Sequence, residues 1–477
     1  MKKNADINSI IKRKEDIQKM EEKKPEETGA SLFGRSMDLM NDDPLEEIFA
    51  LNLGDFLSEC LISDDLAKKI GKSEKDKKDK TESLKNQLKE LVSIYSLDNT
   101  LCVLGFNSKE DYVIYNSIAK TISQMLDVDA CHVYLTKDFA KGLDTEKHDL
   151  LLVGSSIDFE DDIYKENIGY NLNQHAFVAD AFNTRDIIEI KNPNENKNFV
   201  PNKALFEDKV KLLYAIPMSN NAYNVGVVVV ESYSKKTFKK ELCNLIVSMA
   251  RLFATSMSLQ KTIDDVNNLL ADENAGMMDL QHMRAELTAL IGDLGDEQQI
   301  FVTLLAKAVD AKGEYKVAHS QLTADLSRLI CKNLKLNEKT SDLIYYAGLL
   351  QNVGKITLPE DLFNHGGKLT KEDWEKLQNH PNVGVNLLMN INFLSEVIPY
   401  IHYHKERWDG RGEPEGLRGM SIPLGSRIIA IADAYTALTS ERPFRAALSK
   451  EKALEILKEE AGVKWDPVIY EALTNVV

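Results

Sequence analysis

The sequence lacks cysteine pairs, long apolar runs and an excess of positive charge. Its five cysteines are scattered without a CxxC pair, which argues for reduced thiols and against a disulfide framework or a zinc ribbon. No stretch approaches the roughly 18 apolar residues of a membrane span, and no apolar stretch follows the charged N-terminus, so we expect no signal peptide. A net charge of −16 argues against DNA, RNA or an anionic membrane as a partner. We therefore expect a soluble, cytoplasmic protein.

At 477 residues the chain is too long for one core, and two or three domains are expected. Residues 1–92 form an N-terminal extension, of which residues 1–40 are polar, charged and predicted to be disordered. Residues 44–70 carry apolar positions at helical spacing, which fits a docking helix for a partner or a helix packed on its own chain. Residues 72–80 mix both charge signs and are typical of a solvated linker.

Residues 93–262 alternate between helical and strand patterns. Residues 111–126 have a helical period. Strands are predicted at residues 130–135, 150–155, 212–217 and 224–232. This pattern predicts an α/β domain.

The same segment resembles a GAF domain, a small-molecule sensor with an antiparallel sheet and flanking helices. The residues that carry the resemblance are Val128-Asp129-Ala130-Cys131, Ile168-Gly169-Tyr170-Asn171, Ala215-Ile216-Pro217 and Val225-Gly226-Val227-Val228. The resemblance implies an unknown small molecule as ligand. Residues 202–208 resemble in part the signature of cyclic-nucleotide-binding GAF domains. Cys131 and His132 fit either contacts to a haem or chromophore or ordinary core and surface positions.

A heptad pattern follows, beginning at Leu242. Its a and d positions are Leu242, Leu245, Met249, Leu252, Ser256, Leu259, Ile263, Val266, Leu270, Glu273, Met277, Leu280, Arg284, Leu287, Ile291 and Leu294. Only Ser256, Glu273 and Arg284 interrupt the apolar seam, and Gly292 and Gly295 are expected to end it.

This seam predicts a long signalling helix over residues 263–300. The coiled coil is expected to begin in the last helix of the preceding domain. A period of 3.5 residues imposes a left-handed supercoil with a partner helix. We expect a parallel coiled coil in a homodimer. The alternative is a long helix packed along its own domains.

Residues 301–477 show helical periods, and the region predicts an all-α domain. Residues 348–355 read GLLQNVGK and residues 404–414 read HKERWDGRGEP. These segments resemble the HD-GYP branch of the HD phosphohydrolases, which has His-Asp in the first segment and His-His-Glu and Gly-Tyr-Pro in the second. Further matches lie at residues 318–320, 358–360, 369–370, 379–384, 427–445 and 465–467.

The resemblance implies a helical HD-type fold and hydrolysis of cyclic di-GMP by two or three bridged metal ions. Such ions generate hydroxide near neutral pH and clamp the phosphate. The family's ligand positions correspond here to His319, Gln351, Asn352, His380, His404, Lys405 and Asp433. Four of them match the family, which implies a residual site for one Fe, Mn or Zn ion; these are His319, His380, His404 and Asp433.

The other three positions are degenerate. Asn352 carries no charge to bridge two metal ions, Gln351 offers only a weak carbonyl oxygen, and Lys405 brings a cation. The resemblance assigns phosphate contacts to Lys355, Arg442 and Arg445, which fit surface ion pairs equally well. Glu413 replaces the family's Tyr and brings a negative charge near them.

We therefore predict an intracellular signalling protein with a GAF sensor, a dimerising helix and a degenerate HD-GYP output domain. The output is expected to be catalytically inactive and to bind a cyclic dinucleotide or a protein partner. The alternative is a metal-dependent phosphodiesterase with a reduced metal site.

Overall fold

The computed structural model describes residues 74–97, 111–140, 147–157, 168–193, 209–234, 237–272, 275–312, 318–359, 362, 370–389, 391–441 and 446–477. The helix predicted at residues 44–70 lies outside these ranges, as do the N-terminal tail and residues 202–208.

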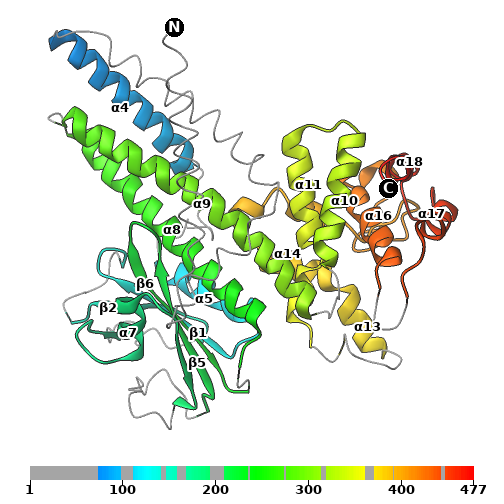
Figure 1. Ribbon diagram of the computed structural model, residues 1–477, viewed down its shortest axis with the longest axis horizontal. Helices are drawn as coiled ribbons and strands as arrows, with labels where there is room; N and C mark the ends of the chain where they lie inside the picture. Colours follow the sequence, from blue (N-terminus) through cyan, green and yellow to red (C-terminus); the bar gives the residue numbers. More distant parts are fainter. Residues whose placement is uncertain are drawn as a thin grey trace, which may run out of the picture. The chain divides into compact units, whose positions relative to one another are not determined.

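A six-stranded antiparallel sheet organises the first domain, in the order β3-β2-β1-β6-β5-β4 (Figure 1). The strands are β1 (Ala130–Thr136), β2 (Leu150–Ser155), β3 (Gly169–Tyr170), β4 (Ile188–Lys191), β5 (Leu212–Ser219) and β6 (Asn224–Ser232). The predicted helix over residues 111–126 is α5 (Asp111–Leu126). This confirms the α/β class and places the four predicted strands within two residues of their observed ends.

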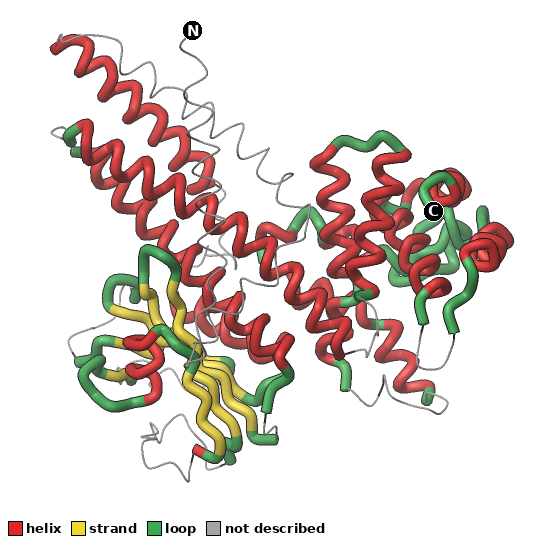
Figure 2. Tube along the Cα trace, in the orientation of Figure 1, coloured by secondary structure: helices red, strands yellow, loops and turns green. Residues whose placement is uncertain are grey.

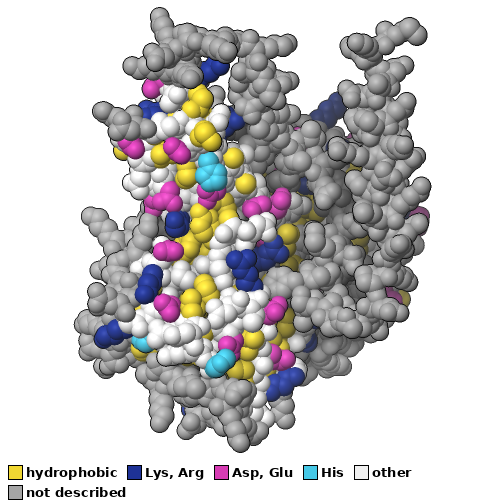
Figure 3. Space-filling model, turned by 60° about the vertical axis from the view of Figure 1, so that its left-hand side comes forward, with side chains coloured by type: hydrophobic (Ala, Val, Ile, Leu, Met, Phe, Trp, Pro, Cys, Tyr) yellow, Lys and Arg dark blue, Asp and Glu magenta, His cyan; other side chains and the backbone are white. Residues whose placement is uncertain are grey.

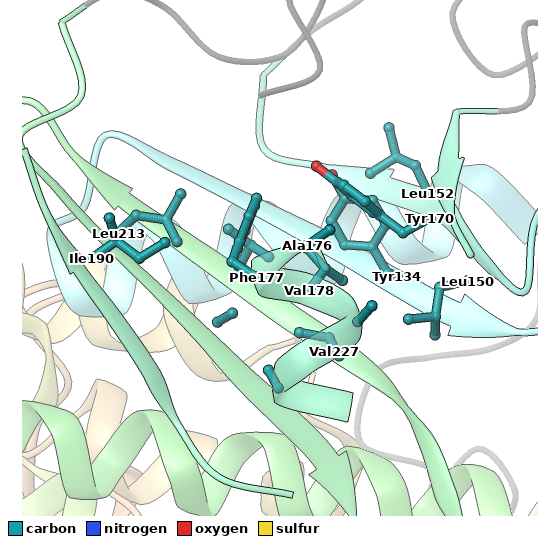
Figure 4. Close-up of a cluster of buried hydrophobic side chains, with 14 of the residues drawn as sticks. Tyr134, Leu150, Leu152, Tyr170, Ala176, Phe177, Val178, Ile190, Leu213 and Val227 are labelled. Carbon is teal, nitrogen blue, oxygen red and sulfur yellow. The ribbon is translucent and has the colours of Figure 1, made fainter. Parts of the chain in front are cut away.

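Helices cover both faces of the sheet, which explains the run of valines in β6. Its residues from Val225 to Val230 are all buried, because α5 and α8 (Lys240–Ala271) pack on one face and α7 (Phe177–Thr184) packs on the other (Figure 2). On the α7 side, Phe177 and Val178 point into a cluster with Tyr134 of β1 (Figure 4). Burial on both faces removes the simple alternation of a half-exposed strand.

The seam predicted as one long helix is folded into a hairpin. Helix α8 ends at Ala271, the chain turns, and α9 runs from Met277 to Lys312. Arg251 pairs with Glu297 at 2.7 Å and the hydroxyl of Thr262 lies 3.4 Å from Glu286, which is an antiparallel register. The prediction that one helix carries the register from Leu242 to Leu294 is therefore wrong.

The apolar seam is largely buried inside the chain. Leu252 and Ile263 of α8 and Leu287 and Ile291 of α9 are at most 4% exposed. The prediction that Gly292 and Gly295 end the run is also wrong, since α9 continues through both. These apolar residues are therefore buried without a second chain. The homodimer remains a prediction.

Helix α4 (Glu74–Leu97) is the third member of this bundle. Its buried leucines include Leu84 and Leu88. Gln87 accepts a hydrogen bond from Arg284 of α9 at 3.0 Å. The solvated linker predicted over residues 72–80 is thus corrected, because residues 74–80 belong to this helix.

By length and composition alone, α8 is apolar enough to cross a membrane. However, 67% of its apolar window is buried inside the protein, as in the core helix of a packed domain. On the face shown in Figure 3, acidic and basic side chains of the described residues are interspersed. Mixed charge of this kind is typical of a solvated surface.

The C-terminal domain is helical, as predicted. Its α-helices are α10 (His319–Asn333), α11 (Glu338–Leu350), α13 (Lys371–Gln378), α14 (His380–Leu388), α15 (Ile398–His402), α16 (Leu424–Thr439), α17 (Lys450–Glu459) and α18 (Pro467–Thr474). Short 3-10 helices are η5 (Val353–Thr357), η6 (Asn392–Leu394) and η7 (Gly419–Ser421). Helix α16 packs against α10, α11 and α15.

Replacing Leu88 by alanine tests the docking of α4. Leu88 is 0% exposed, so Leu88→Ala leaves a cavity and weakens local packing by about 2–5 kcal/mol. Hydrogen exchange of the α4 amides, followed by mass spectrometry, is expected to accelerate by at least tenfold. The exposed neighbour Lys89→Ala is the control and is expected to leave exchange unchanged. Equal exchange in both variants would show that α4 does not depend on this contact.

Candidate functional site

The metal-ligand positions predicted from the sequence lie in the C-terminal domain, and all except Asp433 are at or near helix ends. They are His319 at the start of α10, Gln351 and Asn352 after α11, His380 at the start of α14, His404 and Lys405 after α15, and Asp433 within α16. All except Lys405 and Asp433 are buried. Helix ends suit such a site because their side chains can converge from several directions.

Two glycines allow these segments to approach closely. A Cβ on Gly354 would lie 1.9 Å from the carbonyl oxygen of His380, so only glycine lets η5 contact the start of α14. A Cβ on Gly425 would lie 2.6 Å from the ring of Tyr400, so α16 can lie directly on α15. These contacts place Asn352 near His380 and Asp433 near the segment that carries His404.

The carboxylate of Asp433 is the centre of the site. Its Oδ1 lies 2.8 Å from Nε2 of His319 and accepts a hydrogen bond from Nε2 of Gln351 at 3.2 Å. Its Oδ2 accepts a hydrogen bond from Nζ of Lys405 at 3.1 Å. Both carboxylate oxygens are therefore engaged by groups of the protein itself.

Lys405 also sets the ionisation of Asp433. Burial alone would raise the pKa of this carboxyl group. The positive charge of Lys405 and the hydrogen bond with His319 outweigh burial and hold the pKa well below its usual range. Asp433 is thus an anion whose charge is balanced by an ammonium group.

His380 and His404 form a second pair beside the carboxylate. Their ring centres are 5.5 Å apart. Nδ1 of His380 lies 2.6 Å from the carbonyl oxygen of Leu377, and Nδ1 of His404 lies 2.7 Å from that of Ile401. Because a carbonyl only accepts, each Nδ1 carries the proton and each Nε2 carries a lone pair.

Both imidazoles are neutral at physiological pH. Burial lowers the pKa of His404 to about 3, and the charge of Lys405 acts in the same direction. Burial also lowers the pKa of His380 well below its usual value, assisted by the charge of Lys355. Neutral imidazole is the form that binds metal ions.

The residues do not fit a bridged two-metal centre. Asn352 has no charge, and Asp433 already binds Lys405, so neither of these two residues offers a free carboxylate to bridge two cations. Among the described residues, no three His, Cys, Asp or Glu side chains meet in a metal-holding group. The two imidazoles can still contribute ligands to one ion.

Lys355 lies on η5 next to this site. Its charge lowers the pKa values of His380, His404 and Asp433, which places its ammonium group in their surroundings. Arg442 and Arg445 lie outside the described residues. Glu413 is exposed on the loop after Lys405. The phosphate-binding role of Lys355 thus remains a prediction that its location favours.

Two buried carboxylates position this site: Asp310, which sequence reasoning missed, and Glu406, which it quoted only as part of the segment 404–414. Asp310 of α9 accepts hydrogen bonds from the backbone N–H and hydroxyl of Ser320, at 3.0 and 2.7 Å, and so fixes the start of α10. Glu406 accepts the backbone N–H groups of Glu415 and Gly416 at 2.8 and 2.9 Å, and so closes the loop after His404. Asp310 gave no local signal, because its partner is ten residues away.

The two candidates in the first domain are buried. His132 lies 3.1 Å from Glu231 and 3.0 Å from the hydroxyl of Ser155, and all three side chains are buried. Cys131 is also buried, which raises the pKa of its thiol. A reactive cysteine is expected to be accessible and to have a lowered pKa. These observations favour core positions for both residues.

Comparison with known protein families identifies two domains. A GAF domain model matches residues 113–257, and an HD domain model matches residues 303–469. The chain therefore carries a GAF domain followed by an HD domain, and the candidate site lies wholly within the HD domain.

Curated relatives match part of this chain. The 3'3'-cGAMP-specific phosphodiesterase 1 of Vibrio cholerae serotype O1 is 37% identical over 184 residues, which cover 38% of this chain and 43% of that protein. The cyclic di-GMP phosphodiesterase response regulator RpfG of Xanthomonas campestris is 31% identical over 193 residues, which cover 40% of this chain and 51% of that protein. The chain thus spans about half or less of the length of these relatives.

A double-mutant cycle tests the ion pair between Lys405 and Asp433. Because Lys405 is 39% exposed, screening reduces the pair's worth, and we expect a coupling energy of about 1 kcal/mol between Lys405→Met and Asp433→Asn. Thermal unfolding of the four proteins gives this value. Lys405→Arg is the control and is expected to keep most of the stability. A coupling energy near zero would contradict the contact.

Proposed function

We propose that this protein is a signalling protein whose HD domain binds a cyclic dinucleotide without hydrolysing it. The observation that carries this proposal is the hydrogen bond from Lys405 to Asp433. The ammonium group of Lys405 occupies the carboxylate that a catalytic metal ion would need as a ligand. We infer that the GAF domain senses a small molecule inside the cell and regulates this output, through binding of the dinucleotide or of a protein partner.

Loss of hydrolysis follows from the electrostatics of the site. Two-metal phosphodiester cleavage needs one ion to generate the nucleophile and another to stabilise the leaving oxygen. Asn352 supplies no charge between the ions, and the ammonium group of Lys405 repels any dication near Asp433. The described residues of the site therefore offer too few anionic ligands to hold two ions together.

Binding of an anionic ligand is compatible with the same residues. Lys405 and Lys355 bring two positive charges close to the carboxylate of Asp433, and the neutral imidazoles add none. A phosphodiester can accept hydrogen bonds from such ammonium groups. The names of the aligned relatives, which act on 3'3'-cGAMP or cyclic di-GMP, support a cyclic dinucleotide as the ligand class.

Calorimetry and a hydrolysis assay on the full-length protein test this proposal. We expect cyclic di-GMP or 3'3'-cGAMP to bind and to remain intact on chromatography after long incubation with Mn²⁺ or Fe²⁺. Lys355→Ala is expected to weaken binding about tenfold, which corresponds to about 1.4 kcal/mol for a charge-assisted contact.

Lys452→Ala is the matched control, since Lys452 is an exposed lysine that pairs with Glu455 on α17. It is expected to leave the affinity unchanged. Turnover of either dinucleotide would refute the non-hydrolytic function. Absence of binding to both, in a folded protein, would refute the ligand class and leave a protein partner as the output.

A further inference from the structure

Three buried oxygen atoms on one face of the GAF sheet have no hydrogen-bond partner. They are Oε2 of Glu231 and the hydroxyl oxygens of Tyr134 and Tyr170. Glu231 and Tyr134 are 0% exposed, and Tyr170 is 6% exposed. Buried polar atoms are nearly always satisfied, so a group of three indicates a bound molecule that supplies the missing partners.

The three side chains lie close together on the face of the sheet that α7 covers. Tyr134 and Tyr170 belong to the buried cluster on this face, and their ring centres are 5.5 Å apart (Figure 4). Glu231 follows Val229 of the same cluster by two residues along β6, so its side chain points to the same side. Burial raises the pKa of both phenols, and the negative charge of Glu231 adds to the increase, which places this carboxylate near the two hydroxyl groups. The hydroxyl groups themselves do not meet at hydrogen-bond geometry.

The other oxygen of Glu231 is held by a neutral imidazole. Oε1 lies 3.1 Å from Nε2 of His132, and Nδ1 of that ring lies 3.0 Å from the hydroxyl of Ser155. This hydroxyl already accepts the backbone N–H of Ile157 at 3.1 Å, so its own proton is directed to Nδ1. His132 then carries its hydrogen on Nε2 and donates it to Glu231. Among the described residues, no lysine or arginine pairs with Glu231, so its carboxylate is buried without a balancing cation.

These groups select a ligand with a positive charge. A buried carboxylate without a counter-charge is costly, and a cationic ligand removes that cost, whereas a water molecule satisfies the oxygen atoms without balancing the charge. An ammonium group has three N–H donors, which matches the three unpartnered oxygens. The ring of Tyr170 makes edge-to-face contacts with Tyr134 and with Phe177, at 5.5 and 5.7 Å between centres. Aromatic rings attract cations as well.

We propose that this face of the GAF domain binds a small organic amine, whose ammonium group donates to Glu231, Tyr134 and Tyr170. His132 and Ser155 are positioning residues, because they hold the carboxylate through Oε1 and leave Oε2 for the ligand. This inference rests on the proposed function, in which the GAF domain senses a small molecule, and it gives that molecule a chemical class.

Four small probes on the full-length protein test this assignment. Methylamine and n-butylamine are cations at neutral pH, whereas n-butanol and butyrate are neutral and anionic molecules of similar length. Binding is followed by saturation-transfer NMR and by the thermal midpoint. We expect both amines to bind and to raise the midpoint, and we expect n-butanol and butyrate to do neither.

Glu231→Gln keeps the shape of the side chain and an acceptor for His132 but removes the charge. It is expected to weaken binding of n-butylamine about tenfold or more, because a charge-assisted hydrogen bond is lost. Glu189→Gln is the matched control, since Glu189 is an exposed glutamate of β4 in the same sheet. This variant is expected to keep the affinity of the wild type.

Each outcome decides for or against the site. Equal binding of n-butylamine and n-butanol, or equal binding of n-butylamine by the wild type and a folded Glu231→Gln variant, overturns the inference. No binding of either amine also overturns it and leaves an ordered water only. If Glu231→Gln does not fold, Tyr170→Phe replaces it: weaker binding supports the site, and unchanged binding contradicts it.

These results are separable from those of the HD domain. Failure of both amines to bind leaves the calorimetric test of dinucleotide binding untouched. Amine binding that leaves the dinucleotide affinity unchanged supports this site and refutes the regulation of the output by the GAF domain.

Discussion

The carboxylate of Asp433 ties together segments of the HD domain that are far apart in the sequence. This carboxylate contacts His319 at the start of α10, Gln351 at the end of α11 and Lys405 in the loop after α15. A carboxylate that is largely shielded from solvent is costly unless it is paired and hydrogen-bonded, so these three partners stabilise the charge of Asp433.

The fold was most predictable where local patterns decide it. The strands from Leu150 and Asn224 and the helix from Asp111 appear with their predicted bounds, because each had a clear apolar period and polar flanks. The heptad seam failed for a physical reason. An apolar stripe indicates that a helix packs against a partner, but it does not identify that partner. Because the chain turns after Ala271, α9 of the same chain packs against α8.

The site was predictable in its residues and unpredictable in its contacts. The resemblance to HD-GYP domains named every side chain around Asp433, and the charge of Lys405 already argued against two metal ions. Only the structure shows that the ammonium group of Lys405 forms an ion pair with Asp433 instead of pointing into solvent. The supporting roles of Asp310 and Glu406 could not be found from spacing, because both carboxylates bind backbone N–H groups nine or ten residues away, which follow no motif.

The replacements in this site are consistent with one another electrostatically. Compared with the HD-GYP pattern, asparagine at position 352 lacks a negative charge and lysine at position 405 adds a positive one, and both differences disfavour bound dications. The lysine then satisfies the one carboxylate that remains. This site is also connected to the helical hairpin, since Asp310 of α9 fixes the N-terminus of α10, where His319 meets Asp433. Because α9 also pairs with α8 through Arg251 and Glu297, the one helix α9 contacts both α8 and the start of α10.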